Sequence, residues 1–148
     1  MREVAKRANT TTPTLYERFE DREALLWAVV AHVQSDVYGR VANADSLKQI
    51  SEIIICYLGE FPGRLDLMNR YWPKIVISQW PKPVFELAKK KLIAEKKCSA
   101  DTAEEVAYSL AALLFGTTIL MRTAGQDSPI SRKVQESSLK AVQVLCEK

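Results

Sequence analysis

Residues 4–26, VAKRANTTTPTLYERFEDREALL, constrain the fold more than any other part of the chain, because they hold the signals for two short helices around a tight turn. Asn9 tolerates the left-handed backbone in which many helices end. Thr12 followed by Pro13 predicts the next helix start, since a threonine hydroxyl caps free N–H groups and proline presets φ. The first helix has a small apolar face made of Val4, Ala5 and Ala8.

The second short helix is predicted to have one apolar and one polar face. Leu15 and Phe19 lie four residues apart, so both point toward the apolar face of the preceding helix. The opposite face is polar and consists of Thr12, Thr14, Glu17 and Arg18. A protruding polar face of this kind suits the groove of a nucleic acid.

The segments TPTLYERF and EDREALL resemble the recognition-helix signature of the tetracycline-repressor (TetR) family of transcriptional regulators. That signature has a small polar helix start, Leu-Tyr-x-x-Phe, and then a helix beginning Lys-x-x-Leu-Leu. Here Asn9 stands where the family usually has glycine, Glu20 where it has proline or a small residue, and Arg22 where it has lysine. The resemblance implies an all-α, TetR-like fold, with a partial helix-turn-helix head and connecting helix in residues 1–44 and a ligand-binding and dimerisation domain in residues 45–148.

The DNA-reading head of that family has three helices, and this chain matches it from the second helix onward. We therefore expect an N-terminally truncated head that lacks the first helix. The cause would be a start codon upstream, a trimmed chain or a natural headless variant, and the sequence does not choose among these. Residues 1–44 carry six basic and six acidic side chains, so the head is neutral as written.

The resemblance also implies which residues contact DNA. Threonines at the start of the second helix would face the bases, while Lys6, Tyr16 and Arg22 would hold phosphates. The full set of predicted DNA-binding residues is Lys6, Thr11, Thr12, Pro13, Thr14, Tyr16 and Arg22.

Composition favours an all-helical body. The chain has 148 residues and only five glycines, and no segment alternates between apolar and polar residues as a half-buried strand does. Helices are predicted from Asp21 to about residue 43, after Asp45, over 64–79, after Pro83, over 101–125 and over 130–148. Proline inside the 64–79 pattern predicts a kink or break near Tyr71 and Trp72. Uninterrupted apolar runs fall far short of the roughly 20 residues of a membrane span, so we expect a cytoplasmic protein without a membrane partner.

The last two predicted helices have the pattern of an interface. Large apolar side chains recur in helical register, and small residues between them allow close approach of another helix. In the family, the corresponding pair forms the twofold dimer interface. The predicted interface residues are Leu110, Leu113, Leu114, Thr117, Met121, Val134, Ala141, Val142 and Leu145. The alternative is that these stripes pack only within one subunit.

A binding site for a small apolar or aromatic effector is implied by the family and not by a motif. Aromatic and thioether side chains around the middle helices are the candidates. They are Tyr57, Phe61, Met68, Tyr71, Trp72, Trp80, Phe85 and Phe115. For each of them, packing in the core is the alternative role.

These observations favour a ligand-responsive transcriptional regulator, a repressor, that binds palindromic double-stranded operator DNA as a homodimer. The alternative is a headless small-molecule-binding or interaction protein that dimerises without binding DNA by itself. We expect no enzyme, because the chain lacks a nucleophile–base pair, metal ligands and a glycine-rich phosphate loop. Three isolated cysteines and one histidine likewise predict no metal and no cofactor.

Overall fold

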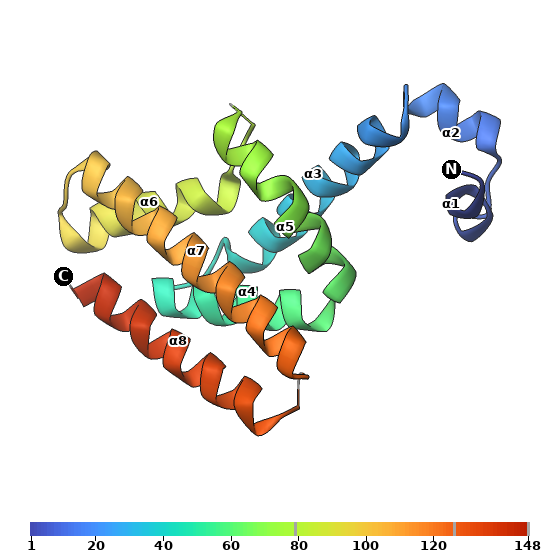
Figure 1. The fold of residues 1–148 in the computed structure, drawn as a ribbon. Coiled ribbons are helices and arrows are strands. Elements are labelled where there is room, and N and C mark those ends of the chain that lie inside the picture. Colours follow the sequence, from blue (N-terminus) through green and yellow to red (C-terminus); the bar gives the residue numbers. More distant parts are fainter. Residues whose placement is uncertain (79, 126, 148) are drawn as a thin grey trace. The chain divides into compact units, whose positions relative to one another are not determined.

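The computed structural model describes residues 1–78, 80–125 and 127–147, and the regular structure in these ranges is entirely helical. The helices are α1 (Arg2–Arg7), α2 (Thr12–Arg18), α3 (Arg22–Val41), α4 (Leu47–Glu60), α5 (Pro62–Ile77), α6 (Pro83–Lys96), α7 (Ala100–Ala124) and α8 (Pro129–Glu147). This order is drawn in Figure 1. The predicted all-α class is confirmed.

The chain divides into two compact units, Met1–Val33 and Gln34–Lys148. The division falls inside α3. The first unit therefore holds α1, α2 and the first part of α3. The second unit holds the rest of α3 and the helices α4 to α8. The domain boundary at residue 44, which the family resemblance implies, stays a prediction.

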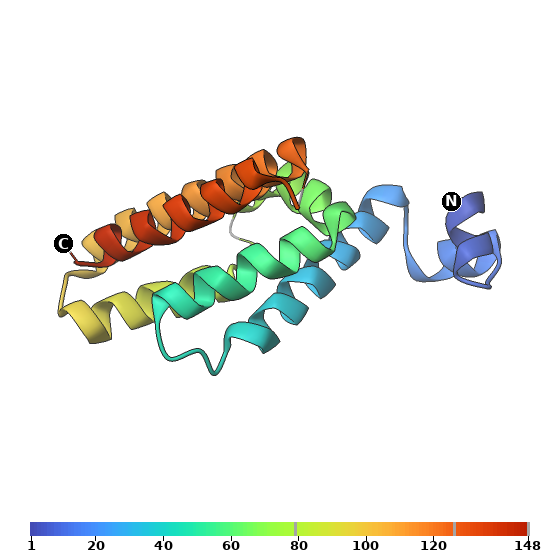
Figure 2. The ribbon, with the colours of Figure 1, turned by 90° about the horizontal axis from the view of Figure 1, so that it is seen from below.

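Helix α4 lies at the centre of the second unit and contacts α5, α6, α7 and α8. Its buried side chains include Ile50, Ile55 and Leu58, which are at most 5% exposed. Helices α7 and α8 run antiparallel and side by side in both Figure 1 and Figure 2. Burial of the apolar faces of these helices supplies the main stabilisation of this unit, at about 25 cal/mol for each Å² of apolar surface removed from water.

The helix starts follow local chemistry. Asp21 caps α3 by accepting a hydrogen bond from the Ala24 N–H at 2.7 Å, as its position predicts. Ser46 caps α4 by accepting from the Gln49 N–H at 3.2 Å. Helix α4 ends at Glu60 and α5 begins directly at Pro62, because proline is well suited to the first turn of a helix.

Of the kink or break predicted near Tyr71 and Trp72, the break is wrong, and the kink stays a prediction. The helix continues through Pro73 to Ile77, although proline removes one backbone hydrogen bond from a helix interior. Tyr71 and Ile75 lie on either side of it and are both 0% exposed. Their burial holds this helix in place and offsets the cost of the proline.

Helix α7 is long and apolar enough to cross a membrane if only length and composition are considered. Core helices of soluble proteins satisfy the same criterion, and α7 contacts α4, α5, α6 and α8. Uninterrupted apolar runs do not reveal this property, because polar residues are spaced along α7 at intervals. The finding is weak evidence for a membrane location.

Candidate nucleic-acid interface

The turn after α1 is a left-handed helix end. Asn9 has φ of 50°, which confirms the conformation predicted for it. The Thr10 N–H donates to the Ala5 carbonyl at 2.9 Å, and the Asn9 N–H donates to the Lys6 carbonyl at 3.2 Å. These two bonds form a Schellman motif, which satisfies the last carbonyls of α1 and reverses the chain.

Helix α2 begins one residue earlier than predicted. Thr11, and not Thr12, is the capping residue, because its hydroxyl accepts a hydrogen bond from the Thr14 N–H at 3.2 Å. Thr12 is therefore the first helical residue and Pro13 the second. Three consecutive threonines offer the same capping group, so the preceding turn decides which of them caps the helix.

A small apolar contact joins α1 to α2. Ala5 is 3% exposed and Leu15 is 8% exposed, and the two helices are in contact. Phe19 is half-buried, as expected for a residue on the inner face. Val4 and Ala8, which the sequence places on the same apolar face, are both exposed. Six residues make less than two helical turns, and only one position of α1 faces α2 fully.

The outer side of α2 presents polar side chains to solvent. Tyr16 is 53% exposed and Pro13 is exposed, while Thr12 and Thr14 are half-buried. The Thr11 and Thr14 hydroxyl oxygens lie 2.8 Å apart, so these two side chains hold each other in place.

Cations lie on the neighbouring elements. Lys6 and Arg22 are exposed near the end of α1 and at the start of α3. Arg7 pairs with Glu3 at 3.2 Å, but both side chains are more than two-thirds exposed, and such a pair contributes little to stability. The unit thus offers hydroxyls flanked by exposed cations, which is the chemistry that holds a phosphate backbone beside a groove.

Two short helices joined by a tight turn, with the second helix polar on its outer side, define a helix-turn-helix of the kind that binds DNA. Residues 1–29 match the family described as bacterial regulatory proteins, tetR family, and this range includes both short helices and the first turns of α3. Residues 1–29 are therefore similar to the DNA-binding part of TetR-family transcription regulators. Comparison with curated proteins and with solved structures found no match.

All the predicted DNA-binding residues lie within the matched range. Lys6 belongs to α1, Thr11 caps α2, and Arg22 is the first residue of α3. The remaining four occupy α2, and they are Thr12, Pro13, Thr14 and Tyr16. Their individual roles in DNA contact stay predictions.

The predicted effector residues are distributed over several ring contacts in the second unit. Trp72 pairs with Phe115 at 5.2 Å between ring centroids, and Tyr57 pairs with Phe61 at 5.4 Å. Phe85 pairs with Tyr108, which was not predicted, at 4.6 Å. Four of the eight predicted side chains are buried, namely Tyr57, Met68, Tyr71 and Phe85.

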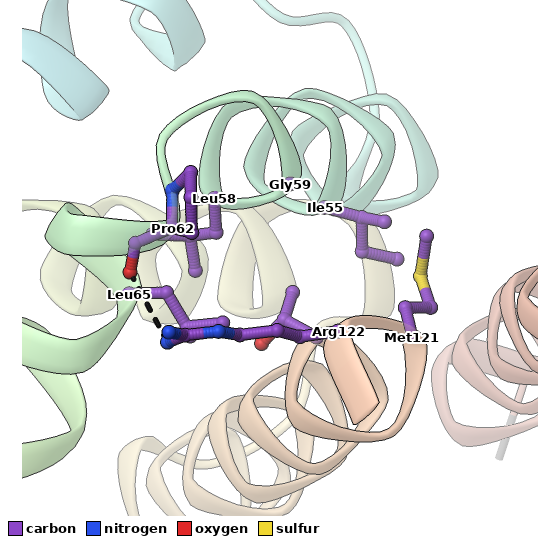
Figure 3. A pocket seen from close by; sticks show the side chains of 8 residues that line it. Ile55, Leu58, Gly59, Pro62, Leu65, Met121 and Arg122 are labelled. Atoms are coloured by element: carbon purple, nitrogen blue, oxygen red, sulfur yellow. Dashed lines mark hydrogen bonds between the residues drawn. The ribbon is translucent and has the colours of Figure 1, made fainter. Parts of the chain in front are cut away.

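A pocket is found instead between α4, α5 and α7, where aliphatic side chains meet one arginine (Figure 3). The pocket is small, with a volume of about 10 Å³, which is room for a single water molecule. The lining residues are Ile55, Leu58, Gly59, Pro62, Leu65, Thr118, Met121 and Arg122. Sequence reasoning missed these residues, because aliphatic side chains in helical register look the same whether they line a pocket or fill a core.

A charged cluster joins three helices of the second unit. The Asp36 carboxylate, on α3, accepts hydrogen bonds from the Tyr57 hydroxyl at 2.9 Å and from Arg64 Nη1 at 2.6 Å. Arg40 adds a longer contact to Asp36 at 3.4 Å. The Arg64 guanidinium also lies over the Phe61 ring, 4.1 Å from its centroid. These contacts fix the end of α3 to the adjoining ends of α4 and α5.

The cluster shifts the pKa values of its members in opposite directions. The hydrogen bond from Tyr57 lowers the pKa of Asp36 below its usual value of 3.8, and Arg64 and Arg40 lower it further. Burial raises the pKa of Tyr57 above its usual value of 10.0, and the hydrogen bond to Asp36 adds to that increase. The carboxylate is therefore charged and the phenol neutral at physiological pH.

Proposed function

We propose that the chain is a transcription regulator of the TetR family, a ligand-responsive repressor that binds palindromic operator DNA as a homodimer in the cytoplasm. The observation that carries the proposal is the exposed polar face of α2 within a helix-turn-helix. A helix of this kind lies in the major groove, and a twofold pair of such helices reads two half-sites.

Within each head, Thr12 and Thr14 would contact base edges, because hydroxyls both donate and accept hydrogen bonds. Tyr16, Lys6 and Arg22 would contact phosphates, and the exposure of all three supports this role. Phosphate contacts supply affinity that falls as salt concentration rises, while base contacts supply sequence preference.

Exposed apolar side chains on α7 and α8 support the homodimer. On α7 the exposed residues Ala112, Gly116, Ile119, Leu120 and Thr123 follow a single helical stripe. On α8 the corresponding stripe contains exposed Ile130 and Val144, and half-buried Val134 and Ala141 lie between them. Four predicted interface residues are instead buried within one subunit, namely Leu110, Leu114, Thr117 and Val142. The proposed interface therefore uses the outer stripes of both helices.

A ligand would change DNA affinity only if it bound one conformation of the protein more tightly than another. Helix α3 has residues in both units. We propose that ligand binding displaces the C-terminal end of α3, and that this displacement alters how α2 contacts DNA. We assign repression to the ligand-free state on the basis of the family resemblance.

The proposed role of α2 in DNA binding is tested by measuring how tightly single-residue variants bind DNA. A duplex is first selected from a random library by the full chain. Tyr16→Phe and Thr14→Ala should then each weaken binding by up to about tenfold, the cost of one hydrogen bond. Tyr38→Phe is the matched control, because Tyr38 is an exposed tyrosine outside the matched range. Unchanged affinity in both reader variants would show that α2 does not read DNA.

A further inference from the structure

We propose that Asp36, Tyr57 and Arg64 form a latch that holds the C-terminal part of α3, residues 34–41, against α4 and α5. The latch opens while the other helices of the second unit stay folded. Its opening does not depend on DNA binding, so the latch goes beyond the proposed function. It gives the displacement of α3 proposed above a physical route.

Residues 34–41 of α3 are attached to the second unit by few side chains. Each of the helices α4 to α8 approaches at least one other closely, whereas α3 makes no comparable backbone approach to them among the described residues. The buried apolar side chains in this part of α3 are those of Val37 and Val41, and valine is short. Helix α4 instead buries Tyr57 and several large aliphatic side chains. Segments with few buried contacts are those that open locally at low cost.

Three hydrogen bonds close the latch. Asp36 Oδ2 accepts from the Tyr57 hydroxyl at 2.9 Å and from Arg64 Nη1 at 2.6 Å, so α3 is held by side chains from α4 and α5. Arg64 Nη1 also donates to the Tyr57 hydroxyl oxygen. Tyr57 is 1% exposed, whereas the Asp36 and Arg64 side chains are 29% and 31% exposed. One side of the latch is thus anchored in the core, and its charged groups are within reach of water.

Opening leaves each member of the latch with a partner. If α3 moves away, Arg64 keeps its hydrogen bond to Tyr57. Asp36 keeps Arg40, which lies one helical turn later on α3 and donates from Nε to the other carboxylate oxygen, Oδ1, at 3.4 Å. The two partly exposed charges regain water. Because the main penalty for breaking such a contact is an unpaired buried polar group, opening this one has a low cost.

Amide hydrogen exchange of the full chain, followed by mass spectrometry, tests whether α3 opens alone. Val142→Ala is the informative variant, because Val142 is 0% exposed on α8 and its truncation destabilises the core. Exchange in α4, α7 and α8 should accelerate at least about tenfold, whereas exchange in residues 34–41 should stay unchanged. Equal acceleration in both would show that α3 opens only when the whole unit unfolds, and would overturn the proposal.

The role of the latch residues is tested by the same measurement. Asp36→Asn removes the charge and should accelerate exchange in residues 34–41 at least about tenfold, since it weakens hydrogen bonds to a charged group. Asp66→Asn is the matched control, because Asp66 pairs with Arg122 between α5 and α7, and this pair stays in place when α3 opens. Exchange in residues 34–41 should be unchanged in this control. No acceleration in Asp36→Asn, or equal acceleration in both variants, would overturn the assignment.

A folding control by circular dichroism keeps these outcomes separate. If Val142→Ala is unfolded, Ala107→Gly takes its place as a milder change in α7, with an acceleration of about fivefold expected outside α3. If Asp36→Asn is unfolded, Arg64→Gln replaces it with the same expected result. DNA binding is measured separately on the wild-type chain. A wild type whose α3 opens alone but which binds no DNA would refute the proposed function and support the latch.

Discussion

Asp36 is a single carboxylate that receives hydrogen bonds or ion pairs from three helices, through Arg40, Tyr57 and Arg64. Each contact favours the charged carboxylate over the neutral acid. The pKa of Asp36 in the folded protein is therefore lower than in the unfolded chain, where Asp titrates near its ordinary value. By linkage, Asp36 contributes stability above that ordinary value, and this contribution is lost as the pH falls through the folded pKa.

We predict that Asp36→Asn lowers the free energy of unfolding at pH 7 and that the difference from the wild type shrinks below about pH 4. Urea unfolding followed by circular dichroism between pH 7 and pH 3 measures this. Asp45→Asn is the control, because Asp45 is an exposed aspartate outside the cluster. A difference between wild type and Asp36→Asn that stays constant over this range would contradict the assigned role.

Sequence reasoning did not find this cluster. Tyr57 and Arg64 are 21 and 28 residues away from Asp36, and no local pattern relates them. Only the spacing of Asp36 and Arg40, four residues apart on one helix, was visible, and such a pair is common on solvated helix faces. The helix-turn-helix itself was predictable for the opposite reason, since its residues lie close together in the sequence and form its geometry through local bonds.

Individual elements were predictable to the extent that their ends depend on neighbouring residues. Asn9 and Asp21 were correctly assigned, because each acts on backbone groups within three residues. The course of α5 through Pro73 was not predictable, since burial of Tyr71 and Ile75 against other helices overrides the local preference. The α2 cap lies between these cases, because the sequence restricts it to adjacent threonines without choosing one.

The assignment of Thr11 as the cap leads to a prediction for α2. Thr11→Ala should destabilise the start of α2 by about 1 kcal/mol, whereas Thr12→Ala should have a smaller effect. Amide hydrogen exchange at Thr14 is the direct measurement, since its N–H donates to the Thr11 hydroxyl. Exchange should accelerate by up to about fivefold in Thr11→Ala. A larger acceleration in Thr12→Ala would restore the sequence-based placement of the cap.

At the scale of the whole molecule, α7 has two apolar faces, one buried within the subunit and one exposed to solvent. Residues of α7 that face α4 and α8 are buried, and the exposed stripe through Gly116 and Leu120 lies elsewhere on α7. Sequence periodicity detected that α7 and α8 are apolar, but it did not separate the two faces, because both are apolar. Only the positions of the neighbouring helices within the subunit reveal which residues remain available to a second copy.

We predict that the wild-type chain sediments as a dimer and that Leu120→Lys sediments as a monomer at micromolar concentration. Leu120 is 57% exposed on α7, and a lysine there would bring two ammonium groups into an apolar twofold contact, where charges are strongly disfavoured. Ile77→Lys is the matched control, because Ile77 is 87% exposed but lies at the end of α5. It should remain dimeric. Sedimentation velocity separates the cases: a monomeric wild type, or dissociation caused by Ile77→Lys and not by Leu120→Lys, would place the dimer contact outside the α7–α8 stripes.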